Sequence, residues 1–208
     1  MSGRISDAKL YLCTDARLVQ NDFREFCKMA FAGGVDIIQL RDKTIDAATE
    51  LRALETLAEV ADTYDALWAV NDRADIARIS GAPILHVGQD DLSAMQAREI
   101  VGEGVFIGRS SHAMGESVSE NEDSRVDYFA VGPCWPTPTK PGRPAPGLDL
   151  IRQVSAFDTS KPWFAIGGID LARVAEVLAA GATRIVVVRA ITEAPDPEAA
   201  ARALRQML

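Results

Sequence analysis

The sequence predicts an α/β protein built as a single (β/α)₈ TIM barrel, one domain spanning residues 1–208. Short apolar runs of strand length alternate with longer helical patterns, which is typical of a parallel sheet. Eight such runs occur, and eight strand–helix units favour a closed barrel. An open doubly wound sheet is the alternative, but the glycine fingerprint of its dinucleotide-binding version is absent after the first run.

The predicted strands are residues 10–13, 36–40, 67–70, 84–87, 105–107, 128–131, 163–166 and 185–188. Between two of them, residues 47–61 carry apolar side chains at helical spacing. Residues 170–180 begin with Asp170 as a capping residue and end before Gly181, so both ends of a helix are indicated. Residues 197–208, rich in Ala and Arg, predict a closing helix.

Composition narrows the function classes. Apolar residues make up 48% and charged residues 25% of the 208 residues, as in ordinary soluble proteins. The net charge of −8 argues against non-specific binding of nucleic acid and of anionic membranes. Three widely spaced cysteines, Cys13, Cys27 and Cys134, predict free thiols in a reducing compartment. With no apolar run of signal-peptide or membrane-spanning length, we expect a cytoplasmic protein.

Basic residues follow the second predicted strand, at the end of a barrel where catalytic groups gather. Strand alternation points Gln39, Arg41 and Lys43 to one side and Leu40 and Asp42 to the other. Arg offers a planar fork to phosphate oxygens and Lys a point charge. The sequence therefore predicts an anion site here, and a salt bridge to a nearby carboxylate is the alternative.

Carboxylates follow the third and fourth strands. Asp72 lies in the segment 71–73, and Asp90 and Asp91 follow Gly88. Oxygen ligands on neighbouring strands, with basic groups nearby, suit Mg²⁺ held partly by protein and partly by phosphates. Helix capping is the alternative, with Asp90 or Asp91 capping a helix that begins near Leu92.

Three further segments indicate anion binding. Residues 108–112, with Ser110, predict hydroxyls and N–H groups at a helix start, although a plain cap would look the same. Gly167 and Gly168 after the seventh strand and Arg189 after the eighth occupy the usual phosphate site of this fold, although paired glycines also make tight turns. His112 receives no chemical role, and His86, within the fourth strand, is expected to be buried or to act through a neighbour.

The segment 132–147 is rich in Pro and Gly and predicts a long loop rather than a helix. A loop of this length in a compact chain is usually functional. Its basic residues Lys140 and Arg143 suit a lid over an anion.

In this order, the motifs resemble those of the thiamine-phosphate synthase family. They are QLRDK at 39–43, NDR at 71–73, HVGQDDL at 86–92, GRSSH at 108–112, GPCWPTPTKP at 132–141, AIGGI at 165–169 and VVVRAI at 186–191. The resemblance covers nearly the whole chain, and the 132–141 segment together with QLRDK and GQDD is its most specific part.

The resemblance implies a role for each matched residue. The aminopyrimidine diphosphate would be bound by Gln39, Arg41, Lys43, Asn71, Ser110 and Lys140, of which Arg41, Lys43, Ser110 and Lys140 form the catalytic set. Asp72 and Asp91 would hold Mg²⁺. The thiazole phosphate would be bound by Thr137, Thr139, Gly168 and the backbone at Val188. Leu40, Asp42, Pro138 and Arg189 complete the substrate-binding set.

The resemblance also implies a reaction. The family joins 4-amino-2-methyl-5-(diphosphooxymethyl)pyrimidine to a thiazole ethyl phosphate, giving thiamine monophosphate and diphosphate, and a dissociative, carbocation-like step needs no protein nucleophile. Two departures concern Arg189, where the family more often has Ser, and Arg109, where a small apolar residue is expected. The alternatives are a thiazole tautomerase-like isomerase on the same barrel and a non-catalytic sensor of thiamine phosphates. A homo-oligomer is compatible with the sequence.

Overall fold

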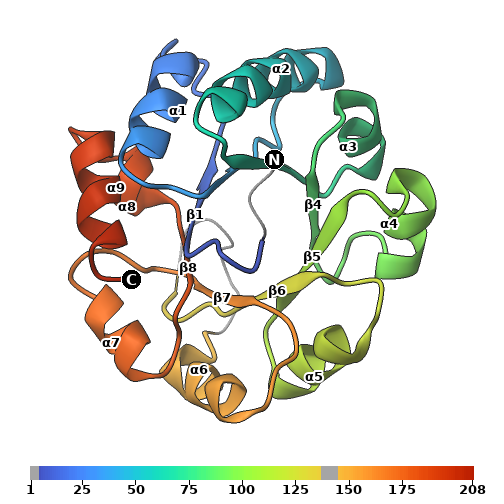
Figure 1. The fold of residues 1–208 in the computed structure, drawn as a ribbon, viewed down its shortest axis with the longest axis vertical. Coiled ribbons are helices and arrows are strands. Elements are labelled where there is room, and N and C mark those ends of the chain that lie inside the picture. Colours follow the sequence, from blue (N-terminus) through green and yellow to red (C-terminus); the bar gives the residue numbers. More distant parts are fainter. Residues whose placement is uncertain (1–4, 137–144) are drawn as a thin grey trace.

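In the computed structural model, which describes residues 5–136 and 145–208, the strands form a closed parallel barrel in the order β1 to β8, with β8 paired to β1 (Figure 1). The predicted fold class is confirmed. The strands are β1 (Leu10–Thr14), β2 (Ile37–Leu40), β3 (Leu67–Asn71), β4 (Ile84–Val87), β5 (Phe106–Ser111), β6 (Tyr128–Val131), β7 (Trp163–Ile166) and β8 (Ile185–Val187).

Helices ring the barrel in Figure 1. They are α1 (Phe23–Ala32), α2 (Ala47–Thr63), α3 (Ala74–Ser80), α4 (Ala94–Val101), α5 (Met114–Glu122), α6 (Gly147–Ala156), α7 (Val174–Ala179), α8 (Arg189–Thr192) and α9 (Pro197–Arg205). Asp46 caps α2 and Asp196 caps α9, each accepting from a backbone N–H three residues on. Asp170 accepts from the N–H of Arg173, but α7 itself begins only at Val174.

Alternation along each strand divides the apolar side chains between two clusters. On β1, Leu10 and Leu12 pack in the cluster shared with the helices, whereas Tyr11 and Cys13 belong to the cluster inside the barrel. The three cysteines are free and buried, as predicted. Burial raises the pKa of the Cys27 and Cys134 thiols to about 12, so neither is a thiolate near neutral pH.

Strand β5 corrects the sequence prediction. It continues through Arg109, Ser110 and Ser111, which were expected in a loop at a helix start. Each of these residues pairs with β6, and α5 begins only at Met114. Ser110 is therefore held rigidly on a strand, and the predicted anion cradle at a helix start is wrong for this segment.

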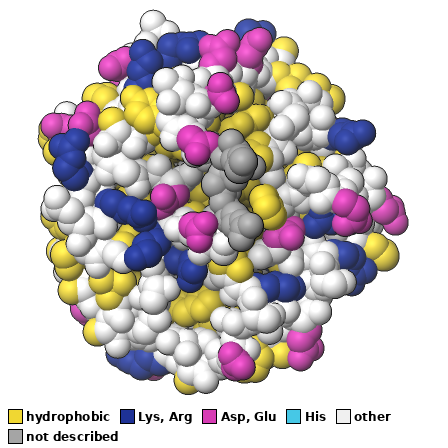
Figure 2. Space-filling view, in the orientation of Figure 1, with side chains coloured by type: hydrophobic (Ala, Val, Ile, Leu, Met, Phe, Trp, Pro, Cys, Tyr) yellow, Lys and Arg dark blue, Asp and Glu magenta, His cyan; other side chains and the backbone are white. Residues whose placement is uncertain are grey.

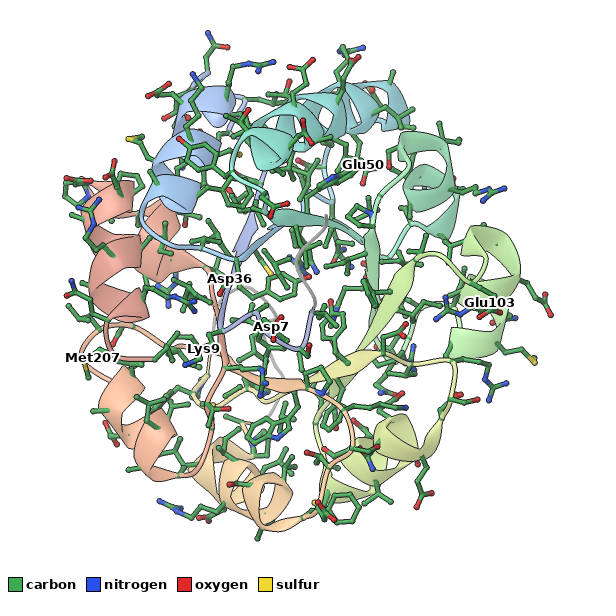
Figure 3. All side chains as sticks on the ribbon, in the orientation of Figure 1. Asp7, Lys9, Asp36, Glu50, Glu103 and Met207 are labelled. Carbon is green, nitrogen blue, oxygen red and sulfur yellow. The ribbon has the colours of Figure 1, made fainter. Side chains whose placement is uncertain are left out.

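The N-terminal end of the barrel is fastened by Asp36, which lies near Asp7 and Lys9 in Figure 3. Its Oδ2 accepts from the backbone N–H groups of Lys9 and Leu10, at 2.7 and 2.9 Å, and from Arg205 at 3.0 Å.

Figure 2 shows Lys and Arg interspersed with Asp and Glu on the face it draws. No helix in the described ranges is long and apolar enough to cross a membrane.

Candidate functional site

A cavity of about 490 Å³ opens at the C-terminal ends of the strands. Its volume suits a small-molecule site of this fold. The predicted site residues that line it are Gln39, Arg41, Lys43, Asn71, Asp72, Asp91, Ser110, Gly168, Val188 and Arg189. The structure therefore brings the segments after β2, β3, β4, β7 and β8 together around one space, with β5 at its floor.

The end of β2 divides as alternation predicts. Gln39, Arg41 and Lys43 line the cavity. Leu40 is fully buried in the cluster shared with the helices, and Asp42 accepts from the N–H of Ala16. The predicted substrate contacts of Leu40 and Asp42 are thus not available to their side chains, because both point away from the cavity.

Lys43 and Asp72 form an ion pair at the rim, with 2.7 Å between Nζ and Oδ2. By contrast, Arg41 has no carboxylate partner among the described residues, although its side chain is half-buried at the cavity. A guanidinium in this position favours a bound anion over the salt bridge that was the alternative. Lys43, by contrast, forms such a salt bridge with Asp72. Its side chain is nevertheless 56% exposed, so it can turn from Asp72 to a ligand.

Asp72 has a backbone conformation that side chains rarely adopt, with φ of 61°. Its N–H donates to the carbonyl of His86 on the neighbouring strand at 2.8 Å, which fixes the residue at the end of β3. Such strain persists where the surrounding structure imposes it and is concentrated at functional sites. The conformation supports a role for the Asp72 carboxylate in the cavity.

Asp91 folds back over the loop after β4, and its Oδ2 accepts from the N–H of Gly88 at 2.9 Å. The predicted capping alternative is wrong, because Ser93 caps α4 in a capping box with Gln96. Asp91 is therefore a cavity carboxylate and not a helix cap.

Two carboxylates fit Mg²⁺ as part of its ligand shell. The described residues contain no cluster of three or more His, Cys, Asp or Glu side chains that would hold a metal alone. Mg²⁺ is commonly bound through one or two carboxylates, with substrate phosphates and water completing the octahedron. Asp72 and Asp91 both line the cavity beside Arg41 and Lys43, and two such carboxylates are compatible with a partial site of this kind.

Arg109, the unexpected residue of β5, clamps the loop that carries Asp91. Its guanidinium donates to the carbonyls of Gly88 and Leu92, at 2.7 and 3.0 Å, and to Gln89 Oε1 at 3.3 Å. Glu120 on α5 balances the buried charge, with 3.3 Å between Oε1 and Nε. The arginine that stands where a small apolar residue is expected thus holds both ends of the β4–α4 loop.

We expect Arg109→Met to lower the free energy of unfolding by about 3–5 kcal/mol, because Glu120 would keep an uncompensated buried charge. Urea unfolding followed by circular dichroism measures this change. Arg152→Met is the matched control, because Arg152 pairs with Asp149 on the surface and should contribute little. Equal stability of the two variants would contradict the clamp.

Polar side chains of five strands form a hydrogen-bonded chain across the barrel, and four of the five residues line the cavity. Gln39 Nε2 donates to the Tyr11 hydroxyl at 2.8 Å, and that hydroxyl lies 3.1 Å from the Tyr128 hydroxyl. Tyr128 lies 3.0 Å from His86 Nδ1, and His86 Nε2 lies 3.1 Å from Ser110 Oγ. Burial raises the pKa of both tyrosines, so both hydroxyls stay protonated.

Sequence reasoning missed this chain. It gave no role to Tyr11 or Tyr128, and it named no partner for His86. Alternation along β1, β4 and β6 carries the signal, because Tyr11, His86 and Tyr128 are polar groups at positions that face the barrel interior. A buried polar group needs a partner, so three of them inside one barrel predict a network.

The opposite side of the cavity is lined by the segments after β7 and β8. Gly168 has φ of 70°, and a Cβ there would lie 2.9 Å from that of Trp135, so only glycine fits without strain. Arg173 donates to the Gly168 carbonyl at 3.0 Å, and its guanidinium lies 5.1 Å from the Trp135 ring centroid. Arg189 begins α8 at the same rim, so two guanidiniums accompany the glycines.

Comparisons with known proteins decide the family. The family described as "Thiamine monophosphate synthase" matches residues 10–191. The chain belongs to this family. A thiamine-phosphate synthase of Mycolicibacterium gilvum is 58% identical over 100% of this chain and 90% of its own length. That of Streptomyces avermitilis is 57% identical over 99% and 95%.

A solved structure from Pyrococcus furiosus, a thiamine phosphate pyrophosphorylase, superposes with a TM-score of 0.86 at 30% identity and covers 97% of this chain and 96% of its own. The chain is therefore an enzyme of the thiamine monophosphate synthase family. Five further residues predicted to act in it, namely Thr137, Pro138, Thr139, Lys140 and Arg143, lie outside the described residues, and so does half of the predicted lid at 132–147.

Proposed function

We propose that the enzyme joins 4-amino-2-methyl-5-(diphosphooxymethyl)pyrimidine to a thiazole ethyl phosphate, releasing diphosphate and giving thiamine monophosphate. Besides membership of the family, one structural observation supports this proposal. A single cavity has a rim with Arg41, Lys43, Asp72 and Asp91 on one side and a glycine-lined rim with Arg173 and Arg189 on the other. Two phosphorylated substrates that meet between these rims match this division.

The first rim suits the diphosphate. Arg41 would bind its oxygens through the planar guanidinium, and Lys43 would leave Asp72 to add a point charge. Asp72 and Asp91 would hold Mg²⁺, which when bound supplies neutralisation of the negative charge on the leaving group. These roles would account for the presence of both negative and positive side chains at this rim.

The second rim suits the monophosphate of the thiazole partner. The positive φ of Gly168 and the absence of a side chain there let the backbone approach a phosphate closely. Arg189 stands at the start of α8, where a Ser is more often expected in the family, and a guanidinium can bind the same oxygens. Arg173, fixed to the Gly168 carbonyl, adds a second positive charge beside it.

In the proposed reaction one bond breaks and one bond forms at the exocyclic methylene of the pyrimidine. The bond between the methylene carbon and the diphosphate oxygen breaks, and its electron pair leaves with the diphosphate. The aminopyrimidine ring donates electrons to the methylene, and the thiazole nitrogen then forms the new C–N bond. The chain's residues align the two substrates and stabilise the departing charge, which are the two largest sources of rate in such a reaction.

The deciding experiment supplies both phosphorylated substrates and Mg²⁺ and measures thiamine monophosphate and diphosphate in equal amounts. Activity should disappear with a chelator and return with added Mg²⁺. An isomerase would convert a thiazole phosphate without the pyrimidine, and a sensor would bind ligand without turnover. Either result in place of the condensation would overturn the proposal, and a rate unaffected by chelation would remove Mg²⁺ from it.

A further inference from the structure

The chain of hydroxyls across the barrel ends on Ser110, and the direction of its protons decides what Ser110 offers to a ligand. We propose that Tyr11 and Tyr128 are positioning residues that hold His86 as its Nε2–H tautomer, so that the Ser110 hydroxyl donates into the cavity. The inference rests on the proposed function for its substrate, but its first test needs no turnover.

The direction follows from Gln39, which starts the chain. Its Oε1 accepts from the Cys13 thiol at 3.4 Å, which leaves the NH₂ group facing Tyr11. An NH₂ group only donates, so Tyr11 accepts there and must give its own proton elsewhere. Among the described residues the other hydrogen-bond partner of Tyr11 is the Tyr128 hydroxyl.

The same reasoning continues along the chain. Tyr128 accepts from Tyr11, so its proton goes to His86 Nδ1 at 3.0 Å. A neutral imidazole that accepts at Nδ1 carries its proton on Nε2, which therefore donates to Ser110 Oγ at 3.1 Å. Leaving any of these buried groups unpaired would cost about 1–3 kcal/mol, so the chain orders its protons together.

This order changes the meaning of the contact between Ser110 and His86. A base that activates a serine must accept its proton, but Nε2 is here the donor. Ser110 is thus not a nucleophile activated by His86. Its own proton remains for a ligand, and Ser110 lines the cavity although the residue is only 8% exposed. The floor consequently selects a ligand atom that accepts a hydrogen bond, such as a ring nitrogen of the aminopyrimidine.

The barrel makes room for this arrangement at one residue. A Cβ on Gly108 would lie 2.1 Å from Cζ of Tyr128. The ring of Tyr128 therefore occupies the space that a side chain at position 108 would need. Tyr128 also packs edge-on against Phe164, with centroids 5.7 Å apart. Its hydroxyl therefore has one position, between Tyr11 and His86.

The tautomer can be read directly, because the sequence has two histidines. Protein labelled with ¹⁵N-histidine should show His86 with Nε2 as the protonated nitrogen and Nδ1 as the unprotonated one. His112, which contacts Glu116 on the surface of α5, serves as the internal control. A spectrum in which His86 is protonated at Nδ1 would overturn the proposal whether or not the enzyme makes thiamine monophosphate.

Two variants separate direction from structure. Tyr11→Phe should leave His86 as the Nε2–H tautomer, because Tyr128 keeps its proton for Nδ1. In the reverse direction His86 is the Nδ1–H tautomer, and Tyr11→Phe would change its tautomer because the Tyr128 proton loses its acceptor. Tyr128→Phe should give a mixture of tautomers and raise KM for the pyrimidine diphosphate about tenfold, with KM for the thiazole phosphate unchanged. Tyr64→Phe, at the end of α2 beside Phe31, is the control. Equal changes in both KM values would indicate a merely structural role and contradict the proposal.

Discussion

Asp91→Asn is expected to lower kcat/KM for diphosphate release on the order of 100-fold. The change keeps an oxygen that can accept from the Gly88 N–H, so the loop after β4 should hold its conformation. It removes the negative charge that, with Asp72, makes this rim suitable for Mg²⁺. The Mg²⁺ concentration needed for the half-maximal rate should therefore rise, and calorimetry should show weaker binding of diphosphate in the presence of Mg²⁺.

The control for Asp91→Asn removes the same charge elsewhere. Glu103 is exposed in the loop between α4 and β5, and Figure 3 labels it beside α4. This loop leads into the N-terminal end of β5, whereas the cavity opens at the C-terminal ends of the strands. Glu103→Gln should leave both the rate and the Mg²⁺ dependence unchanged. If Asp91→Asn behaves like this control, the carboxylate is not part of the catalytic rim and the assignment of Asp91 fails.

Much of this site could be predicted because strand periodicity is a strong signal. The alternation of QLRDK placed Gln39, Arg41 and Lys43 on one face, and all three line the cavity. Leu40 and Asp42 show the limit of carrying over a motif as a block, since neighbouring residues of a strand face opposite sides. The strand-end carboxylates Asp72 and Asp91 were found because strand order brings them to the same rim.

What escaped prediction depends on contacts between side chains of different elements. The sequence shows Arg109 only as a charged residue near a predicted strand end, and its partner Glu120 lies on the following helix. The chain from Tyr11 to Tyr128 joins residues more than a hundred positions apart. Strand β5 was predicted to end too early because Gly108, Ser110 and Ser111 have low strand propensity, and pairing with β6 overrides it.

Lys43→Met is expected to lower kcat/KM on the order of 100-fold or more, with little change in stability. The side chain is 56% exposed and its ion pair with Asp72 lies at the surface, so losing the pair should cost well under 1 kcal/mol of folding free energy. The rate should fall because the departing diphosphate loses a positive charge. Lys28→Met is the matched control, since Lys28 is similarly exposed and pairs with Glu25 on α1.

A double-mutant cycle with Asp72→Asn decides how Lys43 acts. If Lys43 only holds Asp72 in place, the double variant should be no slower than Asp72→Asn alone. If Lys43 leaves Asp72 and acts on the leaving group, removing it should slow Asp72→Asn by about a further tenfold or more, because the two residues then contribute through different contacts. We expect the second result. A bound diphosphate supplies the stronger anion, and the exposed, flexible stem of Lys43 lets it exchange one partner for the other.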